Sequence, residues 1–327
     1  MKISTTMAYN VVMVGAGALG SRHLQAMKNT QNECYFWVVD SSAESLAKCH
    51  KIYEDSPAND KVQGIEFVQN LDAIPAHIDF LLIATGSGPR FSIFKSIVER
   101  SEVKNVVFEK ILFQKLDYYE ETALLLEKKG IKAWVNTPRR MWDFYKEIKP
   151  VFAGTPAHMF MVGGNWGLGC NAIHFIDLYA YLTGNTTYTI DTDGLDRTLY
   201  DSKRVGYKEI NGLLYCSFSN GGSLMLDSSI TNLKAILTIS NEKATFSIDE
   251  GGKVCWINDA EGNRVETFTV PYQSQLTNLV LDSVLENGNC LLPTYKESDK
   301  LHRPFIKGVI DFINNKLEGN TDICPLT

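Results

Sequence analysis

Three glycines near the start of the chain carry the clearest chemical signal in the sequence. The apolar run VVMV ends at Gly15, and Gly17 and Gly20 complete the spacing G-x-G-x-x-G before a segment with helical character. At such a turn the first glycine permits a tight bend, the second lets the backbone approach a pyrophosphate, and the third lets the helix pack closely on the strand. The positive helix start favours phosphate. The residues predicted to hold a dinucleotide are Gly15, Gly17, Ala18, Leu19 and Gly20.

An acidic residue follows at the distance expected of a dinucleotide site. The apolar run Tyr35–Val39 ends in Asp40, twenty residues after Gly20, and no arginine is adjacent. A carboxylate at the end of a second strand can accept hydrogen bonds from both ribose hydroxyls, and it repels a 2′-phosphate. The sequence therefore favours NAD over NADP. The alternative, an ordinary glycine turn followed by a chance acid, does not explain why strand, turn, helix and acid occur in this order.

Two ionisable residues end a further apolar run. Glu109 and Lys110 follow residues 105–108, and Thr85 follows the run 79–84. If both runs are strands of one parallel sheet, these residues lie at its carboxyl edge, where ligands bind. A lysine there can hydrogen-bond a substrate hydroxyl and stabilise developing alkoxide charge. A solvated Glu–Lys pair after a strand is the alternative that stays open.

A predicted helix over 171–183 holds the candidate general base. With Asn171 as its N-cap, this helix presents Asn171, His174 and Asp177 on one face. Imidazole titrates near neutral pH, so His174 is the strongest general-base candidate among the six histidines. The alternative is a histidine at the edge of the core that is bonded to Asp177.

Other polar and aromatic residues are candidate substrate contacts. Asn165 and Trp166 lie in the glycine-rich stretch before this helix, and Arg139 precedes another predicted helix. Trp166 can stack on a sugar ring or anchor the loop as a buried aromatic residue, and both readings stay open. Asn171 can bind a substrate hydroxyl.

The candidate residues up to Lys110 lie in a part of the chain where strand and helix patterns alternate. The predicted strands are 10–14, 35–39, 79–84, 105–108 and 131–135, and the predicted helices are 20–28, 42–51, 91–99 and 117–129. This alternation is typical of a doubly wound parallel sheet. We therefore expect a Rossmann domain of the α/β class over residues 1–136.

The pattern changes after residue 136. Short strand-like runs are separated by turn signals such as Asn220-Gly221-Gly222. The predicted strands are 186–191, 207–218, 222–230, 233–240, 243–248, 253–257 and 264–270, and the predicted helices are 141–149, 171–183, 273–286 and 297–317. We expect an α+β domain over 137–327, with a large, mostly antiparallel open sheet and helices on one face. A C-terminal helix is expected to pack back on the first domain.

The composition argues against several classes of protein. The 327 residues carry a net charge of −6 without a Lys/Arg-rich run, which argues against a nucleic-acid partner. Seven cysteines without a C-x-x-C pair predict reduced thiols and no metal site. Residues 1–8 are too short and polar for a signal peptide, and no apolar stretch reaches the ~18 residues that span a bilayer. We expect a cytoplasmic protein without membrane contact.

Taken together, the motifs resemble those of the Gfo/Idh/MocA oxidoreductases, the family of glucose–fructose oxidoreductase and myo-inositol dehydrogenase. The matching segments are GAGALGSRH at 15–23, IAT at 83–85, EK at 109–110, NTPRRMWDFYKEIK at 136–149 and IHFIDL at 173–178. They occur in the family's order along essentially the whole chain. The resemblance implies an NAD-binding Rossmann domain, a second domain with an open sheet, and a homodimer or homotetramer formed through that sheet.

The resemblance also implies a role for each residue. It makes Lys110 the catalytic lysine and His174 the general base, and it places Glu109 near the nicotinamide ribose. The three glycines hold the pyrophosphate, and Asp40 holds the adenosine ribose. Arg139 matches one of two paired arginines near the domain junction, at least one of which is expected to be structural.

Two departures from the family pattern affect the expected chemistry. The proline that follows Glu-Lys in the family is Ile111 here. The aspartate that family members often carry four residues before the histidine is Cys170, and Asn171 follows it. Neither side chain supplies a carboxylate, so the sequence lacks the acid of a Lys-Asp-His set.

The leading hypothesis is an NAD-dependent dehydrogenase that oxidises a secondary hydroxyl of a sugar or sugar derivative, or reduces the ketone. His174 would accept the hydroxyl proton while a hydride passes to nicotinamide C4, and Lys110 would stabilise the alkoxide. Two alternatives stay open. One is a redox-assisted sugar lyase or glycosidase that retains its NAD. The other is a noncatalytic sensor of NAD or sugar, which Cys170 in place of the acid favours.

Overall fold

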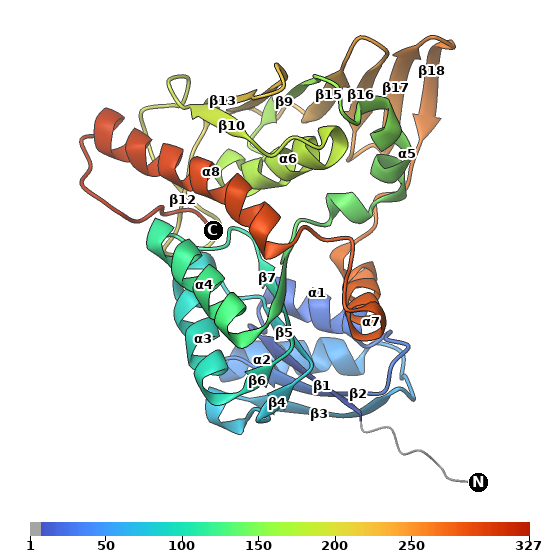
Figure 1. The fold of residues 1–327 in the computed structure, drawn as a ribbon, viewed down its shortest axis with the longest axis vertical. Helices are drawn as coiled ribbons and strands as arrows, with labels where there is room; N and C mark the ends of the chain where they lie inside the picture. Colours follow the sequence, from blue (N-terminus) through green and yellow to red (C-terminus); the bar gives the residue numbers. More distant parts are fainter. Residues whose placement is uncertain (1–7) are drawn as a thin grey trace. The chain divides into compact units, whose positions relative to one another are not determined.

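The chain forms two compact units in a computed structural model that describes residues 8–327 (Figure 1). The first unit comprises the described residues up to Leu112 together with Glu120–Pro138 and Pro271–Tyr295. The second comprises Phe113–Tyr119, Arg139–Val270 and Lys296–Thr327. Residues 1–7, which belong to the polar segment considered above as a signal peptide, lie outside the described residues.

The first unit is built on a six-stranded parallel sheet in the order β3-β2-β1-β5-β7-β8. The strands are β1 (Tyr9–Val14), β2 (Cys34–Val39), β3 (Val62–Val68), β5 (Phe80–Ile83), β7 (Asn105–Glu109) and β8 (Lys132–Asn136). The helices that belong to it wholly or in part are α1 (Ala18–Met27), α2 (Ala43–Glu54), α3 (Ser87–Arg100), α4 (Leu116–Lys129) and α7 (Thr277–Asn287). Two short strands, β4 (His77–Ile78) and β6 (Glu102–Val103), pair beside this sheet. The predicted Rossmann architecture is confirmed.

The strand order of this sheet contains a topological switch point. The order reverses between β1 and β5, and in open α/β sheets ligands bind at the carboxyl ends of the strands at such a point. Val14 is level with Ile83, and Ile83 is level with Phe108, in parallel pairs. The residues that follow β1, β5 and β7 therefore share one edge of the sheet.

The second unit is built on an eight-stranded sheet in the order β10-β13-β14-β9-β15-β16-β17-β18. The strands are β9 (His158–Gly164), β10 (Tyr188–Asp191), β13 (Gly212–Phe218), β14 (Ser223–Ser229), β15 (Ile236–Ser240), β16 (Thr245–Asp249), β17 (Val254–Asp259) and β18 (Gly262–Thr267). Only the pair β9–β14 is parallel in this sheet. A separate hairpin joins β11 (Tyr200–Asp201) to β12 (Lys208–Glu209). The predicted open, mostly antiparallel sheet is confirmed.

Helices cover one face of the second sheet, namely α5 (Asp143–Phe152), α6 (Leu168–Thr183) and α8 (Tyr295–Lys316) (Figure 1). Phe152 packs edge-on against Phe246, and Tyr179 stacks on Phe218 at 3.8 Å between ring centroids. In β9 and in β13 to β17, alternate residues are buried, as expected for a sheet with one solvated side, whereas β18 at the edge has no buried residue.

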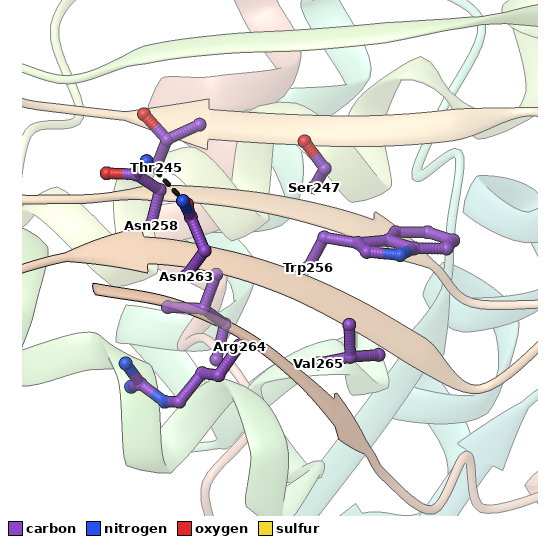
Figure 2. A pocket seen from close by; sticks show the side chains of 8 residues that line it. Thr245, Ser247, Trp256, Asn258, Asn263, Arg264 and Val265 are labelled. Carbon is purple, nitrogen blue, oxygen red and sulfur yellow. Dashed lines mark hydrogen bonds between the residues drawn. The ribbon is translucent and has the colours of Figure 1, made fainter. Parts of the chain in front are cut away.

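The opposite face of the second sheet presents a row of residues that the strand register places side by side. Three of them are large exposed apolar residues: Tyr215, Trp256 and Val265 have exposed fractions of 38%, 47% and 60%. The full row is Tyr215, Met225, Phe160, Thr238, Ser247, Trp256 and Val265. At its β16–β18 end lies a shallow hollow of about 380 Å³, in which Ser247, Trp256 and Val265 are neighbours (Figure 2).

The sequence reading missed one strand in each of the two large sheets. β3 has a mixed burial pattern without a long apolar run. β9 lies between β14 and β15 and ends in Gly163 and Gly164, which the sequence reading placed in a loop. Glycine is depleted in strands except where another backbone approaches closely. That is the case here, because a Cβ on Gly163 would lie 2.4 Å from the Cα of Ala235.

Two element boundaries also differ from the prediction. The helix expected from Asn171 begins at Leu168, with Gly167 as its N-cap in the left-handed conformation (φ 76°). A glycine reaches that conformation without a steric cost, so the helix begins before Asn171, the residue that the sequence predicted as its N-cap. The single strand expected over 207–218 is divided between β12 and β13. No helix among residues 8–327 combines the length and apolar character needed to cross a membrane.

Candidate active site

The glycine turn after β1 has the geometry that its spacing predicts. Gly15 has φ 103°, and a Cβ on it would lie 2.9 Å from the backbone nitrogen of Thr85. A Cβ on Gly20 would lie 1.8 Å from the carbonyl oxygen of Gly15, so α1 packs directly on the turn. A Cβ on Gly17 would meet nothing within 4 Å. Gly17 is therefore the open position of the turn, where a ligand backbone or phosphate has room.

The Asp40 carboxylate links the turn to the end of β2. Its Oδ2 accepts a hydrogen bond from the backbone nitrogen of Ala16 at 2.7 Å, and its Oδ1 accepts one from that of Ser42 at 2.9 Å. These bonds hold a half-buried negative charge beside the turn. A ribose placed there would meet a hydrogen-bond acceptor, and a phosphate would meet a like charge.

Glu109, at the end of β7, belongs to a buried polar network that sequence reasoning missed. Its Oε1 lies 2.9 Å from Nε2 of His23, and it also accepts from the side-chain amide of Asn136. Nδ1 of His23 contacts the Thr277 hydroxyl at 2.8 Å. Burial alone would raise the pKa of Glu109, but the bond and charge of His23, with Lys110 and Asn136, lower it overall. The network thus holds a carboxylate next to Lys110 in its charged form.

Arg90 organises the two loops at this edge. Its side chain is completely buried. Its guanidinium donates to the carbonyl oxygens of Thr85, Ile111 and Leu112. The loop after β5 is thereby fastened to the loop that carries Lys110. The Lys110–Ile111 peptide bond is cis.

In the second unit, the loop before α6 is held by its own side chains. The indole nitrogen of Trp166 donates to the carbonyl oxygen of Asp227 at 2.8 Å, and its ring packs edge-on against Phe175. The Asn171 side-chain amide donates to the carbonyl oxygens of Trp166 and Gly167 at 2.8 and 3.1 Å. Trp166 is thus a partly buried anchor of the loop, and Asn171 braces the loop from inside the helix.

The first turns of α6 expose one side. Cys170, Asn171 and His174 are half-buried, whereas Ala172 and Ile173, which lie between Asn171 and His174 in the chain, are buried. Residues four apart on a helix are neighbours, so Cys170 and His174 lie on the same face. Of the predicted face, Asn171 and His174 are therefore accessible, whereas its third member, Asp177, is buried.

The two arginines after β8 form ion pairs inside the second unit. Arg140 donates to both carboxylate oxygens of Asp177, at 2.7 and 2.9 Å. Arg139 donates to both oxygens of Glu250, at 2.7 and 2.8 Å, and the Tyr145 hydroxyl donates to the same carboxylate at 2.6 Å. Burial alone would raise the pKa of Glu250, but these partners lower it. Both arginines are thus held in ion pairs within the second unit.

The remaining predicted contact, Asn165, lies at the end of β9. It has φ 49°, and its side-chain amide donates to the carbonyl oxygen of Thr231 at 2.8 Å. This left-handed conformation is one that asparagine tolerates better than most residues. Asn165 therefore closes the strand end, and its side chain is exposed to solvent.

A carboxylate that the sequence reading missed lies at the start of α6. Glu209, on β12, accepts a hydrogen bond from the backbone nitrogen of Gly169 and a longer one, 3.4 Å, from that of Cys170. Burial raises its pKa, and the hydrogen bonds from Ile210, Gly169 and Cys170 offset this only in part. Nothing in the local sequence indicates this contact, because forty residues separate Glu209 from Gly169.

The structure therefore gathers the predicted residues into two groups. The edge of the first sheet holds the glycine turn, Asp40, Thr85, Glu109 and Lys110. The start of α6 holds Trp166, Asn171 and His174. Within residues 8–327, no cluster of His, Cys, Asp and Glu side chains is arranged to hold a metal ion.

The switch point, the open glycine turn and the carboxylate at the end of β2 are the features of a Rossmann-type dinucleotide-binding domain. Residues 9–137 match the family model of Gfo/Idh/MocA, described as an oxidoreductase family with an NAD-binding Rossmann fold. This part of the chain is thus similar to the NAD-binding domain of the Gfo/Idh/MocA oxidoreductases. No match was found among the curated proteins.

Solved structures share the fold over nearly the whole chain. UDP-N-acetylglucosamine 3-dehydrogenase GnnA from Acidithiobacillus ferrooxidans is 13% identical with a TM-score of 0.70, over 93% of this chain and 97% of its own. An oxidoreductase from Agrobacterium radiobacter, solved with NAD+, L-tartaric acid and magnesium, is 13% identical with a TM-score of 0.70, over 94% and 97%. Biliverdin reductase from Synechocystis sp. PCC 6803, solved with biliverdin and NADP+, is 17% identical with a TM-score of 0.68, over 91% and 97%. At these identities the likeness concerns the fold.

Proposed function

We propose that this protein is an NAD-dependent dehydrogenase that oxidises a secondary hydroxyl of a sugar or sugar derivative, or reduces the corresponding ketone. The observation that carries the proposal is the edge of the first sheet, where an open glycine turn, the Asp40 carboxylate and Lys110 follow neighbouring strands. The family match supports the cofactor class, and a sugar-nucleotide dehydrogenase with the same fold supports the substrate class.

The residues at this edge fit a dinucleotide. Gly17 leaves space for a pyrophosphate, and the Asp40 carboxylate favours a ribose with two free hydroxyls, hence NAD over NADP. The residues proposed to hold the pyrophosphate are Gly15, Gly17, Ala18, Leu19 and Gly20. Thr85 and Glu109 follow the strands that would lie nearer the nicotinamide. When bound, NAD supplies the acceptor for the hydride that leaves the sugar carbon.

Two side chains handle the rest of the proposed reaction. As the C–H bond breaks and the C–O bond becomes a carbonyl, His174 accepts the hydroxyl proton. Lys110 hydrogen-bonds the same oxygen and stabilises its developing negative charge. Trp166 lies in the loop before α6 and Asn171 lies one turn before His174 on that helix, and these are the two substrate contacts that we retain. Arg139 and Asn165 act through the protein contacts described above.

We further propose a homodimer or homotetramer that forms through the open face of the second sheet. The row that contains Tyr215, Phe160 and Trp256 is an apolar strip across that face, and such strips on soluble proteins mark interaction sites. The sugar would be the partner of residues 137–327, and NAD that of residues 1–136. We expect a cytoplasmic protein, which fits the absence of disulfide bonds among its seven cysteines, all of which lie within the described residues. A monomeric mass in sedimentation analysis would contradict the assembly.

The first test is NADH formation by the purified protein with a panel of polyols, neutral sugars, amino sugars, uronates and nucleotide-linked sugars. Each is supplied with NAD+ and separately with NADP+. We expect one sugar class to give NADH, NAD+ to be preferred, and Lys110→Ala to lower turnover about 10²-fold or more while NAD still binds. Turnover that does not depend on Lys110 would contradict the assigned role.

The same assay separates the two alternatives. A protein that is purified with tightly held NAD and cleaves its sugar without net NADH would be a redox-assisted lyase or glycosidase. A protein that binds NAD and sugar but turns over none of the panel would be a sensor. Either result would replace the proposed dehydrogenase.

A further inference from the structure

The start of α6 carries a carboxylate that comes from another part of the second unit. Glu209 lies on β12, and its Oε1 accepts backbone hydrogen bonds from Gly169 and from Ile210, the latter at 3.0 Å. The Cys170 thiol also hydrogen-bonds to this carboxylate. Glu209 is therefore held by the first turn of the helix whose second turn carries His174.

Two glycines make room for this carboxylate. A Cβ on Gly169 would lie 2.3 Å from Oε1 of Glu209, and a Cβ on Gly167 would lie 3.3 Å from its Oε2. Any other residue at position 169 would displace the carboxylate or the backbone beneath it. The sequence Gly167-Leu168-Gly169 is thus shaped around Glu209, and this contact is a built feature of the fold.

Glu209 changes the electrostatic potential at the start of α6. α6 has 16 residues, and its first turn contains no acidic residue of its own and no side-chain cap. A bare helix start of this kind attracts phosphate or carboxylate groups through its free N–H groups and its positive dipole end. Glu209 already occupies two of those N–H groups and places a negative charge against that end.

We propose that Glu209 is a specificity-determining residue that excludes anionic groups from the start of α6 and selects a neutral or amino sugar. The inference rests on the proposed function, because it assumes that the face with Asn171 and His174 meets the substrate. A uronate carboxylate or sugar phosphate presented to this end would meet a like charge and find the N–H groups of Gly169 and Cys170 already bonded. A neutral hydroxyl or a protonated amine carries no negative charge, so the carboxylate would not repel it.

The experiment removes the charge and keeps the shape. Glu209→Gln is compared with the wild-type protein and with Glu242→Gln, which makes the same charge change at an exposed position of the same unit. Binding of inorganic sulfate is followed by amide chemical shifts in NMR spectra. We expect Glu209→Gln to bind sulfate at least about tenfold more tightly than either control, with the shifts centred on Gly169 and Cys170. In the panel assay, its ratio of uronate to neutral-sugar turnover should rise by a similar factor.

Sulfate affinity equal to that of the controls would overturn the proposal. The wild-type protein provides a second measurement if Glu209→Gln does not fold, because sulfate shifts at Gly169 and Cys170 of the wild type would also overturn it. The sulfate readout does not require turnover. A gain in sulfate affinity without NADH formation from any sugar would therefore keep the role of Glu209 while contradicting the dehydrogenase.

Discussion

The starts of α1 and α6 are alike in sequence and opposite in structure. Both helices have a glycine N-cap without a side-chain cap bond, and both lack an acidic residue in the first turn. At α1, a Cβ on Gly17 would meet nothing within 4 Å, so the helix start is open. At α6, the Glu209 carboxylate fills the space beside Gly167 and Gly169. The start of α1 is therefore open to an anionic ligand, whereas the start of α6 already binds the carboxylate of Glu209.

This difference shows that a helix start defines a site only together with what surrounds it. The dipole and free N–H groups follow from backbone geometry and are common to both helices. Whether they bind a ligand phosphate or a protein carboxylate depends on the chain that packs beside them. We therefore assign cofactor binding to the open start and substrate selection to the filled one.

The comparison is tested most strongly by His174→Ala. If the α6 region performs the chemistry and the α1 region only binds, this variant should lower turnover by about 10²–10⁴-fold, the usual contribution of a general base. The affinity for NAD, measured by fluorescence titration, should stay unchanged. A parallel loss of NAD affinity would contradict the division between the two helix starts, and unchanged turnover would remove His174 from the mechanism.

Gly17→Asp tests the open helix start by giving α1 the carboxylate that α6 already has. Because the position has room and aspartate is a favourable N-cap, the fold should be retained. The charge should weaken NAD binding by about 100-fold, since it occupies the N–H groups and repels the pyrophosphate. Gly17→Asn is the matched neutral control, and an equal loss in both variants would show that bulk rather than charge governs the site.

The smallest expected effect concerns the pH dependence of stability, to which Glu250 and Glu209 should contribute in opposite directions. The pKa of Glu250 lies below its ordinary value of 4.5, so its contribution to stability is present above pH 4.5 and lost as the pH falls through the lowered pKa. The pKa of Glu209 lies above 4.5, so its contribution is present below pH 4.5 and lost as the pH rises through the raised pKa.

Denaturant unfolding of the Glu250→Gln and Glu209→Gln variants across pH measures these contributions. The free-energy difference between the wild-type protein and Glu250→Gln should shrink toward acid pH. The corresponding difference for Glu209→Gln should grow in the same direction. Parallel pH slopes for the two variants would show that the two carboxylates do not differ in the way their surroundings indicate.

The sequence alone predicts most of the first unit. The turn from Gly15 to Gly20, the position of Asp40 and five of the six sheet strands follow from local signals, because apolar runs, glycine spacing and strand ends are short-range features. β3 was missed since it is only half-buried and has no such run. The helix boundary at Leu168 was missed because left-handed Gly167 ends the loop before Asn171.

The contacts between distant residues could not be predicted. The bonds of Glu109 to His23, of Arg139 to Glu250 and of Glu209 to Gly169 join residues that are 40 to 111 positions apart. No local propensity depends on such partners. Their formation depends on which side chains the packed elements bring within hydrogen-bond distance.

The amino-acid sequence by itself determined the class of the protein and the position of its phosphate turn, because glycine spacing, apolar periodicity and a carboxylate at a strand end act over a few residues. Only the tertiary structure decided which charged and polar groups lie beside one another. It buried Arg90 on three carbonyl oxygens, and it brought Glu209 to the helix that carries His174. Charges act through space in a medium of low polarity, so their effect depends on the folded neighbours and cannot be read from neighbours in the chain.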